Sequence, residues 1–293
     1  MRANRKKIAL VSLLVFGVAL NLIYYREKIW EQWALYYLRN QDIVISLTTT
    51  PHRIHQLEFP LQCLSRQNIQ IRQIYLNIPH VFKRDNLSYE IPEWLRNYPN
   101  LTIIRTEDYG PATKILGTLK NAPITDDTII IAVDDDTCYP PNLALRLAAR
   151  AKMHPNVAIG VSGVILDFEK NKSEGVVKIM RDDISVPILE GFAGIAYRKQ
   201  FFDNSIYEIS NEPNYCYNSD DLYLSFHLAA KQITRKTLNN KFIKTYDMNQ
   251  QQFGYLPDAL YRQETSQADR YKQCLNYLTT KFPAVNFDIS STD

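Results

Sequence analysis

Short apolar runs alternate with amphipathic segments along most of the chain, and this alternation predicts its secondary structure. Consecutive or strictly alternating apolar residues are typical of strands, whereas apolar residues every three or four positions are typical of helices. Strands are predicted at 42–47, 71–78, 101–105, 128–133, 157–166 and 191–197, and helices at 55–67, 112–120, 142–153, 220–231 and from about 258 to 281. Strands that alternate with helices indicate an α/β domain with a mostly parallel, Rossmann-type sheet flanked by helices. In such a sheet, ligands bind beyond the carboxyl ends of the strands.

The N-terminal segment follows a different pattern. Residues 1–7 are basic, residues 8–25 form an uncharged apolar run, and residues 26–41 form an aromatic-rich connector with helical spacing. A run of about 18 residues is long enough to cross a bilayer as a helix, so an N-terminal transmembrane signal anchor is predicted at 8–25. A cleaved signal peptide is the alternative. The connector is expected either to lie on the membrane surface or to pack on the domain formed by residues 42–293.

Composition and charge exclude some classes of function. A net charge of +3 and 22% charged residues argue against a nucleic-acid partner. The four cysteines are widely spaced and form no C-x-x-C pair, which argues against a zinc knuckle. They leave open whether the thiols are paired or free.

The most unusual pattern is an acidic triplet at the end of a predicted strand. Residues 129–141 read IIIAVDDDTCYPP. On an extended segment, Asp134 and Asp136 point to one side and Asp135 to the other. Two carboxylates at a strand end form half of a binding shell for Mg²⁺ or Mn²⁺, completed by water and phosphates. The alternative is a solvated turn in which one aspartate caps the helix after Pro141.

Four segments in this order resemble GT-A-fold glycosyltransferases, which use nucleotide-sugar donors. The acidic triplet is similar to their metal site. Two of the other segments precede it, ISLTTTPHRI (45–54) and DYGPATK (108–114). The last follows it and has two parts, EGFAGIAYR (190–198) and NSDDLYLSFHLA (218–229). The resemblance covers residues 42–235. It implies a metal-dependent, hexosyltransferase-like enzyme with Mn²⁺ or Mg²⁺, a UDP- or GDP-sugar donor, and a glycan, protein or lipid acceptor.

Each segment also has a physical interpretation. Hydroxyls at a strand end suit a base or ribose, an arginine suits a diphosphate, and a lysine in the first turn of a helix favours anions. The donor-binding candidates are therefore Thr48, Thr49, Arg53, Asp108, Lys114 and Asp135, and the metal candidates are Asp134 and Asp136. A capping cluster and a surface lysine are the alternatives.

The acceptor side has fewer candidates. Gly191, Phe192 and Gly194 allow close backbone approach to an acceptor, or else mark a bulge. Asp221 is the leading candidate for the base that deprotonates the acceptor, and Asp220 is the second candidate and a helix cap. The chain departs from many GT-A enzymes because no histidine follows His227, so a third protein ligand is absent or comes from Asp247 or Asp258.

The basic N-terminus predicts a single-pass, type II membrane protein with its domain in the Golgi or another endomembrane lumen. A bacterial enzyme would have the reverse orientation, because its donors are cytosolic. Two other functions stay open. A nucleotidyltransferase of similar fold would also use paired aspartates, and a non-catalytic, membrane-tethered sugar- or Ca²⁺-binding module could keep the fold.

Overall fold

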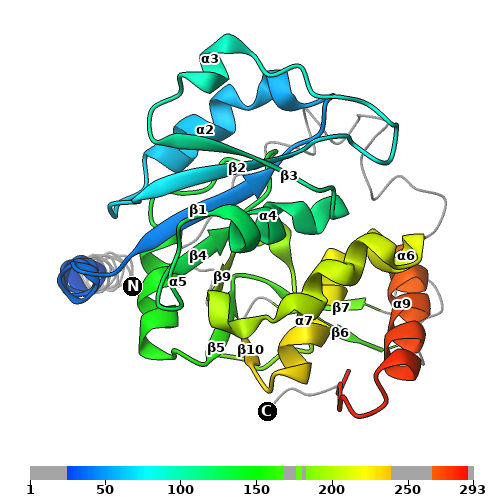
Figure 1. Ribbon diagram of the computed structural model, residues 1–293. Helices are drawn as coiled ribbons and strands as arrows, with labels where there is room; N and C mark the ends of the chain where they lie inside the picture. The colour runs from blue at the N-terminus through cyan, green and yellow to red at the C-terminus, as the bar shows by residue number, and fades with distance from the viewer. Residues whose placement is uncertain (1–24, 168–175, 180–182, 239–265, 290–293) are drawn as a thin grey trace, which may run out of the picture. The chain divides into compact units, whose positions relative to one another are not determined.

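A computed structural model describes residues 25–167, 176–179, 183–238 and 266–289 (Figure 1). The chain divides between Asn40 and Gln41 into two units. In the first unit, residues 25–38 are helical, as the spacing of the connector predicts. Tyr25, Ile29, Trp33 and Tyr36 of this helix are exposed.

The predicted N-terminal transmembrane helix is not supported. No helix in the described residues is long and apolar enough to cross a membrane. The helix at 25–38 is too short, and Arg26, Lys28 and Glu31 interrupt its apolar positions. Residues 8–24 of the predicted span, like the basic residues 1–7, lie outside the described residues.

The second unit is built on a seven-stranded sheet (Figure 1). Its strand order is β10-β5-β9-β4-β1-β2-β3, and the strands are β1 (Ile43–Thr48), β2 (Gln73–Pro79), β3 (Leu101–Thr106), β4 (Ile129–Ala132), β5 (Val157–Gly160), β9 (Ile195–Tyr197) and β10 (Thr234–Thr237). Four strand pairs are parallel, and only β9 runs antiparallel to its neighbours β4 and β5. This mixed sheet is compatible with the predicted α/β class.

The central strands are buried on both faces, as parallel strands usually are. All four residues of β4 are buried, and β1 is buried from Ile43 to Leu47. Ile45 pairs with Ile74 of β2 on one side and with Ile131 of β4 on the other, so the register places apolar residues side by side. This packing fixes where the two strands end, and therefore where the following loops begin.

Helices connect and cover the strands. α4 (Thr113–Asn121) packs against β1, β2 and β3, and α5 (Leu143–Met153) packs against β4, β5 and β9. The other described helices are α2 (Glu58–Ser65), α3 (Glu93–Arg96), α6 (Asn214–Tyr217), α7 (Asp220–Ala230) and α9 (Gln267–Lys281), with 3-10 helices η1 (Ile54–Gln56), η2 (Gly110–Ala112), η3 (Gly191–Ala193), η4 (Lys199–Phe201) and η5 (Asn204–Asn211).

A second, three-stranded antiparallel sheet lies beside α7. It contains β6 (Gly163–Leu166), β7 (Val176–Ile179) and β8 (Ile188–Leu189), in the order β7-β6-β8. The predicted strand 157–166 is thus two strands in two sheets. The predicted strand 191–197 begins as a 3-10 turn, because Gly194 adopts a φ of 98° and separates η3 from β9.

All four cysteines form disulfides. Cys63 of α2 is bonded to Cys138, which follows the acidic triplet by two residues. Cys216 of α6 is bonded to Cys274 of α9, which joins two helices that both contact α7 (Figure 1). The sequence left open whether the thiols are paired or free, and in the structure they are paired.

Candidate active site

The candidate site lies where the order of the strands reverses. From β1 the sheet continues to β2 and β3 on one side, whereas β4 lies on the other side of β1. The carboxyl ends of β1 and β4 are side by side because these strands are parallel. This topological switch point is where open α/β sheets usually bind ligands, and the acidic triplet follows β4 directly.

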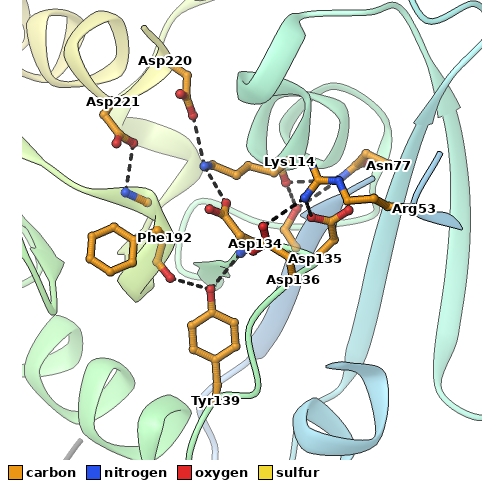
Figure 2. Close-up of polar contacts among 12 residues, drawn as sticks. Arg53, Asn77, Lys114, Asp134, Asp135, Asp136, Tyr139, Phe192, Asp220 and Asp221 are labelled. Atoms are coloured by element: carbon orange, nitrogen blue, oxygen red, sulfur yellow. Dashed lines mark hydrogen bonds and ion pairs between the residues drawn. The ribbon is translucent and has the colours of Figure 1, made fainter. Parts of the chain in front are cut away.

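The triplet is a turn and not an extended segment. β4 ends at Ala132, and the chain turns at Asp135 and Asp136. Asp135 is buried while Asp134 and Asp136 are partly exposed, as alternation predicts. However, the turn directs Asp136 with Asp135 towards Arg53, whose Nη1 lies 3.0 and 2.7 Å from their oxygens (Figure 2). Asp134 is held elsewhere, by Lys114.

The loop after β1 holds the buried member of the triplet. The Thr49 hydroxyl donates to Asp135 Oδ2 at 2.6 Å, and the Thr48 hydroxyl donates to the carbonyl of Asn77 at 2.7 Å. Burial raises the pKa of Asp135, although Arg53 and Thr49 oppose this effect. The two threonines predicted to contact a base or ribose therefore bond to the protein, and Thr49 and Arg53 stabilise the charge of Asp135.

Lys114 connects the triplet with α7. Its side chain is buried, and its Nζ lies 2.8 Å from Asp134 Oδ1 and 3.1 Å from Asp220 Oδ2 (Figure 2). Burial alone would lower the pKa of Lys114, but Asp134, Asp220 and Asp221 hold it well above its ordinary value. Lys114 is therefore a fixed cation at the centre of the site and not a surface lysine.

A buried polar network sets the position of Lys114. The side-chain amide of Asn77 donates to the Lys114 carbonyl at 3.2 Å and to the Thr118 hydroxyl at 3.0 Å. The Ser46 hydroxyl donates to the same carbonyl. Gly117 allows this approach, because a Cβ there would lie 2.5 Å from Asn77 Oδ1. The first turn of α4 is thus bonded to both β1 and β2.

Both carboxylate oxygens of Asp108 are bonded to the protein backbone. Its two oxygens accept the backbone N–H groups of Lys83 at 2.7 Å and Gly110 at 2.8 Å. It therefore joins the loop after β2 to the turn that precedes α4. Gly110 has a φ of 61°, a left-handed conformation that favours glycine.

A cavity of about 410 Å³ opens beside Asp108. His80, Val81, Lys83, Glu107, Asp108, Tyr207, Ser210 and Asn211 line it. These residues follow β2 and β3 or belong to η5, so the cavity lies at the same edge of the sheet as the triplet. Its wall combines an aromatic ring with donors and acceptors, as sites for small ligands do.

The two aspartates that begin α7 differ in environment. Asp220 is paired with Lys114, whereas Asp221 Oδ1 accepts the Gly191 N–H at 2.9 Å. Burial raises the pKa of Asp221 well above its ordinary value, and Asp220 and Glu190 raise it further while Lys114 opposes them. A carboxylate with a raised pKa is a stronger base, so Asp221 has the chemistry of a proton acceptor.

The segment 191–194 borders the same space. A Cβ on Gly191 would lie 2.6 Å from Lys114 Nζ, so a side chain there would displace the lysine. The ring of Phe192 is partly exposed beside Asp221 (Figure 2). Gly194, by contrast, faces Leu143 and Leu147 of α5, so its place in the structure is explained by packing and its positive φ.

The chemistry of the donor set is compatible with a divalent cation. Four carboxylates (Asp134, Asp135, Asp136 and Asp220) pair with the cations of Arg53 and Lys114 here, and Asp221 follows Asp220. No group of three or more metal-ligating side chains occurs in the described part of the chain. Mg²⁺ is commonly held by one or two carboxylates together with substrate phosphates. The two carboxylates would come from Asp134 and Asp136, which are partly exposed and are paired with Lys114 and Arg53 respectively. Asp247 and Asp258 lie outside the described residues.

Sequence reasoning missed three residues of the site. Tyr139 is buried, and its hydroxyl accepts the Asp134 N–H at 2.9 Å and donates to the Phe192 carbonyl at 2.7 Å (Figure 2). Asn77 is a buried polar residue within β2, and Glu190 is a buried residue directly after β8. A polar residue within an apolar strand was the available signal for Asn77, and one directly after such a strand was the signal for Glu190, whereas nothing in the sequence marks Tyr139.

Comparison of the sequence with models of protein families finds no match, and comparison with curated proteins finds none either.

Proposed function

We propose that this protein is a glycosyltransferase that moves a sugar from a nucleotide-sugar donor to an acceptor hydroxyl, with a divalent cation. One observation carries the proposal. The acidic triplet, Arg53 and Lys114 meet at the topological switch point, and a carboxylate with a raised pKa, Asp221, lies on the other side of Lys114. Cations that can bind a diphosphate are thus adjacent to a carboxylate that can deprotonate an acceptor hydroxyl.

The donor side comprises Arg53, Lys114 and the triplet. Arg53 and Lys114 supply fixed positive charge where a diphosphate would lie, and preorganised charge of this kind stabilises a leaving group. Asp134 and Asp136 would hold Mn²⁺ or Mg²⁺, which when bound neutralises negative charge on the leaving diphosphate. The cavity beside Asp108 has space and polar groups for a nucleoside.

The acceptor side comprises Asp221 and the segment 191–194. In the proposed transfer, the acceptor oxygen bonds to the anomeric carbon as the bond from that carbon to the diphosphate oxygen breaks. The bonding electron pair leaves with the diphosphate, and the acceptor proton passes to Asp221. Asp220 keeps Lys114 in place and so positions both halves of the site.

The test is release of nucleoside diphosphate from a panel of UDP- and GDP-sugars in the presence of Mn²⁺. Asp136→Asn should lower turnover at least about 100-fold, because several kcal/mol of charge stabilisation would be lost. Asp126→Asn is the matched control, since Asp126 is exposed and precedes β4 at its other end. Unchanged turnover in Asp136→Asn would remove the metal site. Release of pyrophosphate from a nucleoside triphosphate would instead indicate a nucleotidyltransferase.

A further inference from the structure

The Phe192 ring is presented on a fixed backbone. The backbone carbonyl of Phe192 accepts a hydrogen bond from the Tyr139 hydroxyl at 2.7 Å, and the backbone N–H of the preceding residue, Gly191, donates to Asp221. Gly191 and Ala193 are buried, whereas Phe192 is 36% exposed. An aromatic side chain with an ordered backbone and an exposed ring is suited to stacking against a ligand.

One polar group, the ammonium of Lys178, lies over this ring and is paired with Glu190. Lys178 Nζ of β7 is 4.3 Å from the ring centroid and 3.6 Å from Glu190 Oε2. Glu190 is in turn fixed, because its Oε2 accepts the Ser162 hydroxyl at 2.5 Å. The ammonium of Lys178 thus lies over the ring, Glu190 holds Lys178, and Asp221 is bonded to the residue before Phe192.

We propose that Phe192 and Lys178, the latter held by the buried Glu190, bind a neutral sugar ring of the acceptor, an inference that rests on the proposed glycosyl transfer. The C–H face of a sugar packs on the exposed part of the aromatic ring. Its hydroxyls accept from the ammonium of Lys178, whose side chain is 49% exposed. A sugar held there presents a hydroxyl towards Asp221, which is the group that must receive its proton.

The local charge favours a neutral sugar over an acidic one. Lys178 and Glu190 compensate each other, whereas Asp220 and Asp221 add negative charge to the same side of the site. An anionic acceptor would be repelled there. A lipid chain fits less well, because a single ring offers little apolar area, and Val177, the exposed neighbour of Lys178, points to the opposite face of β7.

The experiment measures binding of neutral methyl glycosides to the full chain by saturation-transfer NMR, without a donor. Phe192→Leu, which keeps apolar volume but removes the ring, should weaken binding about tenfold, and Phe192→Trp should retain it. Phe59→Ala is the matched control, because Phe59 is 43% exposed on α2. Thermal unfolding confirms that each variant is folded.

The outcomes separate this proposal from the proposed function. Equal binding by wild type and Phe192→Leu, no binding by wild type, or binding of methyl glucuronide alone would overturn the sugar subsite, whatever the donor assay shows. Binding that depends on Phe192, without release of nucleoside diphosphate from any donor, would keep the subsite and overturn the transferase.

Discussion

Replacement of Lys114 by methionine tests the central interaction of the site. Lys114 Nζ is shared by Asp134 at 2.8 Å and Asp220 at 3.1 Å. Methionine preserves the length and much of the apolar volume of the side chain but removes its charge. The variant therefore leaves two carboxylates without this cation, one of them, Asp220, only 10% exposed in its side chain.

The expected cost is about 3 kcal/mol in the free energy of unfolding at pH 7. Removal of one partner from a buried ion pair typically costs about 3–5 kcal/mol, because the remaining charge stays buried and uncompensated. The lower end applies here, since the Asp134 side chain is 28% exposed and water compensates part of its charge.

Urea denaturation at pH 7, followed by circular dichroism, measures this cost. Lys120→Met is the matched control on the same helix, because Lys120 and its partner Glu107 are 41% and 63% exposed. That variant should cost less than about 1 kcal/mol. If Lys114→Met is no more costly than Lys120→Met, Lys114 does not stabilise the site as an ion-paired cation and the reasoning is refuted.

Two further predictions follow from pKa values. The raised pKa of Asp221 means that its ionised form costs stability at neutral pH, so Asp221→Asn should raise the urea midpoint at pH 7 while abolishing transfer. Asp220→Asn removes the partner of Lys114 and should lower the urea midpoint. Equal shifts of the midpoint in the two variants would contradict these opposite effects. Burial lowers the pKa of His227 to about 4. The folded state therefore binds fewer protons than the unfolded state between pH 6.5 and 4, and stability should fall by up to about 3 kcal/mol as pH drops through this window. Urea titrations at stepped pH should show that slope in wild type and a flatter one in His227→Phe, and identical slopes would refute it.

Much of the sheet could be predicted because strand positions depend on local apolar patterns. The strands around Ile45, Ile74 and Ile131 were expected within one or two residues at each end, since both faces of these strands are buried. The segment 157–166 was mispredicted as one strand. Apolar residues stand on both sides of Gly160, Ser162 and Gly163, and the structure divides them at this point between two sheets.

The site was less predictable, because its geometry depends on contacts that are distant in sequence. Alternation predicted that Asp134 and Asp136 share a side, but the turn at Asp135 and Asp136 places these two carboxylates against different cations. Lys114 was expected to face a ligand, and its pairing with Asp220 could not be anticipated across more than 100 residues. The types of residue in the sequence indicated which side chains belong to the site, whereas their hydrogen-bond and ion-pair partners could be known only from the structure.

The structure around the acidic triplet and around α7 depends on the oxidation of the four cysteines to two disulfides. One bond anchors the chain directly after the acidic triplet to α2, and the other joins α6 to α9, next to the helix that carries Asp220 and Asp221. Where glutathione keeps thiols reduced, the same chain would carry four thiols and lose both cross-links. Protein prepared in a reducing cytosol therefore differs covalently from the form described here, and the redox history of a sample is a variable in every assay of its activity.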